Sequence, residues 1–121
     1  MLDLLKDAGR DVIAVGKIFD IFDGEGVTEK IKTTGNTNGI AFTKALQTRD
    51  FEGLAFVNLV DFDMLYGHRR DVAGYAAAAT EFDKFVADFI PGMREGDILM
   101  VTADHGCDPS YTKTTDHTRE Y

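Results

Sequence analysis

The sequence is poor in several residue types: its 121 residues include one cysteine, two prolines, three histidines and no tryptophan. A single cysteine excludes an internal disulfide and favours a reducing compartment, so we expect a cytoplasmic protein. No apolar run approaches the length of a membrane span, and the opening MLDLLK is too short and too charged for a signal peptide. The sequence therefore predicts neither a membrane anchor nor a disulfide framework.

Basic residues are also few. There are 13 Lys and Arg against 21 Asp and Glu, a formal net charge of −8. With no basic stripe to neutralise phosphates, the composition argues against a nucleic-acid or anionic-membrane partner. The length allows at most one domain, and a hydrophobic content of 44% is typical of a globular chain.

Short apolar runs alternate with helical patterns along the chain. We expect buried strands over 12–15, 54–60 and 98–101. Helices are predicted over 2–9, from Asn36 or Asn38 to about 48, and over 69–90. Residues 27–32 fit a strand or a loop, and 106–121 fit a loop. This alternation predicts an α/β fold, a parallel sheet with helices on both faces.

The longest expected helix has one apolar stripe in steps of three and four, and Pro91-Gly92 should end it. The stripe comprises Val72, Tyr75, Ala79, Phe82, Val86 and Phe89. Three strands are few for a parallel sheet, the chain opens inside a helical pattern, and no element closes it. We therefore expect one partial domain, a piece of something larger with an uncovered sheet edge that invites self-association.

All three histidines follow an apolar run and have an aspartate close by. His68 follows Asp63 by five residues, and His105 and His117 each directly follow an aspartate. Open α/β sheets build their sites at the carboxyl ends of strands, which is where these pairs are expected. Carboxylates with imidazoles suit Mn²⁺, Zn²⁺ or Fe²⁺. Two such ions about 3.5–4 Å apart would suit phosphoryl chemistry.

Each pair taken alone also fits a surface contact or a turn, and most other polar residues fit ordinary roles. Cys107 is interpreted as a small semi-buried thiol, Ser110 as a loop residue, and Gly24-Glu25-Gly26 as a turn. Lys17 is expected at the carboxyl end of the 12–15 strand, where a phosphate binds readily or where a surface lysine simply stays solvated.

Several segments resemble the phosphopentomutase family of the alkaline phosphatase superfamily. The matching segments are VDFDMLYGHR at 60–69, TADHG at 102–106, TDHTREY at 115–121, GKI at 16–18 and GEGVT at 24–28. The resemblance runs essentially end to end, and it implies an alkaline-phosphatase-like three-layer core. It covers only the carboxyl-terminal part of the family's core domain, after the inserted cap domain.

The resemblance also implies a site with two Mn²⁺ ions. Asp63, His68 and His117 would hold one ion; Asp104 and His105 would hold the other, with an aspartate from an amino-terminal segment that this chain lacks. The threonine that carries the phosphoryl group is upstream too. Lys17 matches a family lysine near the phosphate. The chain alone should therefore be inactive.

The implied reaction interconverts ribose 1-phosphate and ribose 5-phosphate, and the deoxyribose pair. In the related cofactor-independent phosphoglycerate mutases the motif resembles DMVGH, one residue shorter than DMLYGH at 63–68. Two alternatives stay open. One is another mutase or phosphohydrolase of the superfamily; the other is a non-catalytic α/β module that binds metal or a partner.

Overall fold

A computed structural model describes residues 1–119; the last two residues of the loop expected over 106–121 lie outside that range. The chain divides into two compact units, residues 1–60 and 61–121. No helix in the described part is long and apolar enough to cross a bilayer.

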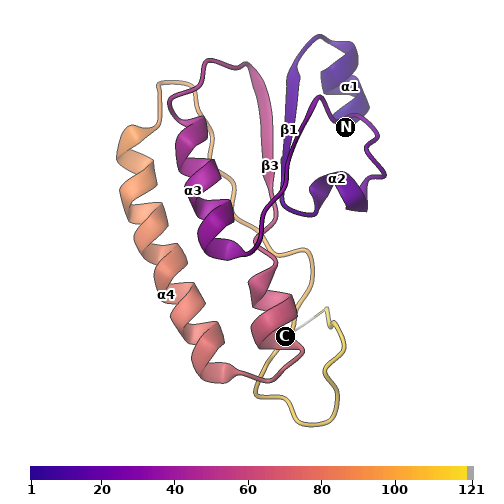
Figure 1. The fold of residues 1–121 in the computed structure, drawn as a ribbon, viewed down its shortest axis with the longest axis vertical. Coiled ribbons are helices and arrows are strands. Elements are labelled where there is room, and N and C mark those ends of the chain that lie inside the picture. The colour runs from indigo at the N-terminus through magenta and orange to yellow at the C-terminus, as the bar shows by residue number, and fades with distance from the viewer. Residues whose placement is uncertain (120–121) are drawn as a thin grey trace. The chain divides into compact units, whose positions relative to one another are not determined.

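The first unit contains a parallel sheet of three strands in the order β2-β1-β3. Figure 1 labels β1 and its neighbour β3. The strands are β1 (Asp11–Val15), β2 (Glu29–Ile31) and β3 (Gly53–Val57). Ile13 of β1 is in register with Glu29 on one side and Ala55 on the other. The predicted strand at 12–15 is confirmed, the one at 54–60 ends three residues early, and 27–32 contains a strand.

Strand β1 is covered on both faces. Side chains alternate across a strand, yet Val12, Ile13, Ala14 and Val15 are all at most 1% exposed. Ile13 and Val15 pack with Leu46 of α3 (Asn36–Leu46). On the other side of β1 lie α1 (Leu2–Asp7) and α2 (Ile18–Ile21) (Figure 1). The predicted parallel sheet with helices on both faces is therefore present.

The helices α1 and α3 have glycines at their ends where side-chain caps could have been used. Gly9 after α1 has a φ of +73°, the left-handed value that glycine adopts at no steric cost. Gly35 is the N-cap of α3, so the expected caps Asn36 and Asn38 are both wrong. Asn36 is buried in the first turn, and Asn38 instead accepts a hydrogen bond from the Thr34 amide at 3.1 Å.

The second unit contains η1 (Phe62–Gly67), a π-helix, and the long helix α4 (Val72–Phe89), which a short 3₁₀ turn, η2 (Ile90–Gly92), ends at Pro91. Asp71 caps α4, its carboxylate accepting a hydrogen bond from the Gly74 amide at 2.8 Å. The helix therefore begins three residues after the predicted start at 69.

The buried side of α4 differs from the predicted stripe. Its buried residues are Ala78 and Phe85, each 7% exposed, whereas Val72 is 50% exposed. The rings of Phe82 and Phe89 flank Phe85, with centroids 5.8 and 5.1 Å from its own. The three- and four-residue steps predicted the helix correctly. The buried residues lie one position before the predicted Ala79 and Val86.

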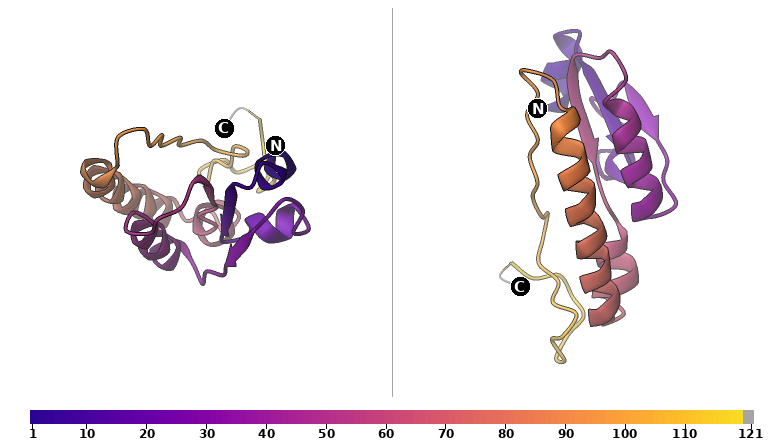
Figure 2. Two further views of the ribbon diagram at one scale, coloured as in Figure 1. Left: turned by 90° about the horizontal axis from the view of Figure 1, so that it is seen from above. Right: turned by 90° about the vertical axis from the view of Figure 1, so that its left-hand side faces the viewer.

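The expected strand at 98–101 is wrong. After η2 the chain returns over the length of α4 without regular structure (Figure 2). Ile98, Met100 and Val101 are 88%, 81% and 59% exposed. An apolar run forms a strand only where a neighbour supplies ladder hydrogen bonds, and within residues 1–119 no strand pairs with this run.

Candidate metal centre

The π-helix η1 brings Asp63 and His68 onto one side of the chain. The His68 amide donates to the Asp63 carbonyl at 3.0 Å, a bond that spans five residues. In an α-helix, with 3.6 residues per turn, residues five apart would point about 140° from each other. The wider π turn aligns them, and such turns are frequent at functional sites. The strand expected over 54–60 ends at Val57, so η1 and not the end of a strand carries Asp63.

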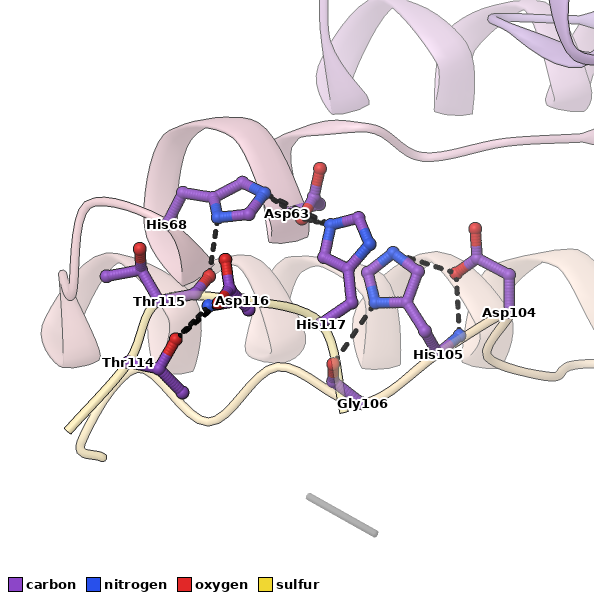
Figure 3. A network of polar contacts seen from close by, with 9 residues as sticks. All are labelled: Asp63, His68, Asp104, His105, Gly106, Thr114, Thr115, Asp116 and His117. Atoms are coloured by element: carbon purple, nitrogen blue, oxygen red, sulfur yellow. Dashed lines mark hydrogen bonds and ion pairs between the residues drawn. The ribbon is translucent and has the colours of Figure 1, made fainter. Parts of the chain in front are cut away.

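Three ligand-type atoms meet at this point, from Asp63, His68 and His117 (Figure 3). Asp63 Oδ1 lies 3.1 Å from Nε2 of both His68 and His117. The two Nε2 atoms are themselves 3.1 Å apart. Donors bound at about 2.0–2.2 Å to one first-row ion lie roughly 3.0–3.5 Å from each other. The triangle therefore has the dimensions of one face of a coordination shell.

The hydrogen bond on the far side of His68 determines which ring nitrogen faces the triangle as an acceptor. Its Nδ1 lies 2.6 Å from the Thr115 carbonyl oxygen, which only accepts hydrogen bonds. Nδ1 therefore carries the proton, and the Nε2 of the neutral ring presents a lone pair to Asp63. Metal-bound histidines usually have this kind of outer partner. Lone pairs converging on a carboxylate repel unless a proton or a cation lies among them.

Asp104 and His105 lie directly beside the triangle. The His105 ring stacks on the His117 ring, with centroids 3.6 Å apart and planes 13° from parallel. Its Nδ1 lies 3.1 Å from the Gly106 carbonyl oxygen, so its Nε2 is also free to accept, 3.7 Å from Asp104 Oδ1. The side chain of Asp104 is 67% exposed. Three of the five predicted ligands thus meet in the triangle, His105 stacks on one of them, and Asp104 lies beside His105.

Loop contacts hold the segments that carry His105 and His117. Gly106 and Thr118 form an isolated antiparallel bridge, with N···O distances of 2.7 and 2.9 Å. The Thr114 hydroxyl donates to Asp116 Oδ2 at 2.8 Å and accepts from the Asp116 amide at 3.0 Å. Asp116 therefore shapes the loop and is not part of the triangle.

The other candidate residues of the sequence lie outside the triangle. Burial raises the pKa of the Cys107 thiol, and the carboxylates of Asp63 and Asp108 raise it further, so the thiol stays protonated. Hydrogen bonds from the Ser110 hydroxyl and amide lower the pKa of Asp108. Lys17 is exposed at the start of α2, in the first unit. Its expected contact with a phosphate stays a prediction.

The sequence reasoning missed two contributors to this centre. The Thr115 carbonyl carries no sequence signal, because every residue has one. The importance of Gly67 was also missed: a Cβ on it would lie 2.7 Å from Cys107 Sγ. The sequence did contain one signal for the π turn: Asp63 and His68 are five residues apart, which is the spacing of a π-helical hydrogen bond.

A two-unit α/β chain that gathers carboxylates and imidazoles around one point defines a metal-binding class of protein. Residues 5–121 match the family model described as metalloenzyme superfamily. The chain belongs to this superfamily, as its fold and its Asp and His cluster suggest.

Curated relatives are more specific. The chain is 61% identical over its whole length to a phosphopentomutase of Lachnoclostridium phytofermentans. It is 54% identical, again over all 121 residues, to the phosphopentomutases of Acetivibrio thermocellus and Clostridium kluyveri. The chain spans 31% of the length of each of these relatives. The predicted resemblance to phosphopentomutases is therefore confirmed, and so is its restriction to part of the family's length.

Proposed function

We propose that the full-length protein is a phosphopentomutase, which interconverts the 1- and 5-phosphates of ribose and deoxyribose. One observation carries this proposal: a chain 61% identical throughout to a phosphopentomutase places Asp63, His68 and His117 donor atoms within 4.8 Å of one another. The substrate is then a small sugar phosphate. The net charge of −8 gives no reason to expect a nucleic-acid partner.

Two divalent ions, Mn²⁺ by family resemblance, complete the proposed site. Asp63, His68 and His117 would hold one ion, and Asp104 and His105 would hold the other with an upstream aspartate. Such ions supply charge stabilisation to a transferring phosphoryl group. This chain's own part is to orient the donors: the Thr115 carbonyl holds His68, and the Gly106 carbonyl holds His105. The donor set fits, because hard carboxylate and imidazole ligands suit Mn²⁺.

The phosphoryl-carrying threonine belongs to the segment upstream of this chain in the proposed enzyme. The 121 residues alone should therefore show no mutase turnover, and turnover by the purified chain would contradict the assignment. The fragment's tendency to self-associate and its cytoplasmic location stay predictions. The location is supported by the single cysteine, which has no second cysteine in the sequence with which to form a disulfide.

The decisive assay gives the full-length protein ribose 1-phosphate, deoxyribose 1-phosphate and phosphoglycerate in parallel. We expect turnover of the pentose phosphates alone. Turnover of phosphoglycerate instead would assign the protein to the neighbouring mutases of its superfamily. No turnover of any substrate, with Mn²⁺ still bound, would favour the non-catalytic metal-binding module.

The metal assignment has its own test. Asp104→Asn in the full-length protein should lower both Mn²⁺ content and turnover, because the amide is a neutral and weaker ligand. Asp83→Asn, at an exposed position on α4, is the matched control and should change neither quantity. Full activity and normal Mn²⁺ content in Asp104→Asn would remove Asp104 from the ligand set.

A further inference from the structure

Two consecutive residues tie the His105 loop to the two segments that carry the histidines of the triangle. Gly106 pairs with Thr118, the neighbour of His117. Cys107 packs against Gly67, the neighbour of His68. The loop that carries Asp104 and His105 is therefore attached next to both histidines of the triangle.

The contact between Gly67 and Cys107 leaves no room for a side chain at position 67. A Cβ there would lie 2.7 Å from Cys107 Sγ, 3.0 Å from the Phe62 carbonyl oxygen and 3.4 Å from Cys107 Cβ. Contacts under 3.0 Å essentially never occur for a real Cβ, so something would have to shift. Gly67 is buried in η1, and Cys107 is half-buried.

We propose that Gly67 is a positioning residue: its missing side chain forms the seat for Cys107 and thereby sets the distance between the two halves of the metal centre. The expected effect on metal binding rests on the metal assignment proposed above. The contact between Gly67 and Cys107 does not depend on that assignment. If the loop withdraws from η1, the His105 ring leaves the His117 ring, now 3.6 Å away between centroids. Asp104 and His105 would then no longer face the position proposed for their ion.

The displacement should come from the loop and not from η1. The turn of η1 is held by the bond from the His68 amide to the Asp63 carbonyl at 3.0 Å and by the bond from the Asp71 amide to the Tyr66 carbonyl at 2.9 Å. The described part of the loop beyond Cys107 contains no helix or strand. A clash at position 67 should therefore be relieved on the Cys107 side.

The test compares variants of the full-length protein by Mn²⁺ titration calorimetry and by crystal structures of the metal-free forms. Gly67→Ala should weaken Mn²⁺ binding about 10- to 100-fold, as loss of an outer-shell support does, and should separate the His105 and His117 rings. Cys107→Leu, which enlarges the other partner, should do the same. Gly92→Ala, an exposed glycine in η2, is the matched control and should change neither quantity.

The double variant Gly67→Ala/Cys107→Ala supplies the rescue. It removes the sulfur that the new Cβ would meet, so most of the lost affinity and the ring stack should return. A double variant no better than Gly67→Ala, or a Gly67→Ala protein with unchanged affinity and stacked rings, would overturn the proposal. If Gly67→Ala does not fold, Cys107→Leu and the double variant decide the question. Should the parent protein bind no Mn²⁺, the metal assignment fails, while the metal-free ring stack still decides whether Gly67 positions His105.

Discussion

The Nδ1 atom of His68 and the carbonyl oxygen of Thr115, 47 residues apart in sequence, are 2.6 Å apart in the structure. This contact joins η1 to the loop that carries His117. It also determines the ring tautomer, because a carbonyl oxygen cannot donate. The orientation of one proposed ligand therefore depends on the backbone next to another.

This contact predicts the tautomer of His68 in the metal-free protein. Nitrogen-15 NMR with labelled histidine should show the proton of the neutral ring on Nδ1. Thr115→Ala should leave the signal unchanged, since only the backbone is used. Thr114→Val, which removes the hydroxyl bonded to Asp116, should loosen the loop and reduce the population with the proton on Nδ1. A proton on Nε2 in the parent protein would contradict the proposed donor set.

Removing one carboxylate from the triangle should abolish metal binding there. Asp63→Asn replaces an anionic oxygen 3.1 Å from two imidazole nitrogens with a neutral amide. We expect the full-length Asp63→Asn protein to lose the part of the Mn²⁺-induced rise in melting temperature that comes from binding at the triangle. Asp61→Asn, two residues away at the N-cap of η1, is the control and should retain the rise. Equal rises in both variants would exclude Asp63 as a ligand.

The cap of α4 should contribute measurably to stability. Asp71→Ala removes the acceptor of the Gly74 amide, so we expect a loss of about 1 kcal/mol in the free energy of unfolding. Asp71→Asn retains a capping oxygen and should lose much less. Urea denaturation of the three proteins measures the difference. Equal stability of the parent and Asp71→Ala would mean that the helix does not depend on this cap.

The apolar stripe predicted from the sequence and the buried side of α4 seen in the structure lead to opposite expectations for two substitutions. Phe85→Ala should cost about 3 kcal/mol or more, because Phe85 is 7% exposed and its ring lies between those of Phe82 and Phe89. Val72→Ala, at a position 50% exposed, should cost under about 0.5 kcal/mol. Thermal unfolding of both variants measures this. A larger loss at position 72 would restore the stripe predicted from sequence.

The ion pair between Glu29 and Arg49 should make a small, pH-dependent contribution. The two hydrogen bonds from Arg49, each 2.8 Å long, lower the pKa of Glu29. A lowered carboxyl pKa stabilises the fold above the ordinary glutamate pKa of about 4.3, and this stability is lost as the pH falls through the folded value. Both side chains are over a third exposed, so solvent screening should keep the loss of stability in Arg49→Gln small at pH 7.

The measurement for this pair is urea denaturation of the parent and Arg49→Gln at pH 7 and near pH 3. The difference between them should shrink at the lower pH, because protonation of Glu29 removes the charge that Arg49 binds. A difference that persists unchanged at pH 3 would mean that Arg49 stabilises the fold through its packing and not through the carboxylate.

The sequence by itself determined the elements whose stabilisation is local or unambiguous. The run at 12–15 is apolar at every position, a pattern typical of a strand buried on both faces, and β1 is such a strand. The steps of three and four along 72–89 predicted α4. The aspartates and histidines offered candidate ligands, and three of them, Asp63, His68 and His117, have donor atoms within 4.8 Å of one another. Side-chain chemistry and periodicity are properties of the chain alone.

Tertiary structure decided what depends on partners distant in sequence. The run at 98–101 is as apolar as the run at 12–15, but no strand within residues 1–119 pairs with it, and its side chains remain exposed. The carbonyl that orients His68 comes from Thr115, 47 residues further along the chain. The space at Gly67 is bounded by the side chain of Cys107, which is also distant in sequence. Backbone groups are alike in every residue, so only the folded chain determines which of them meet.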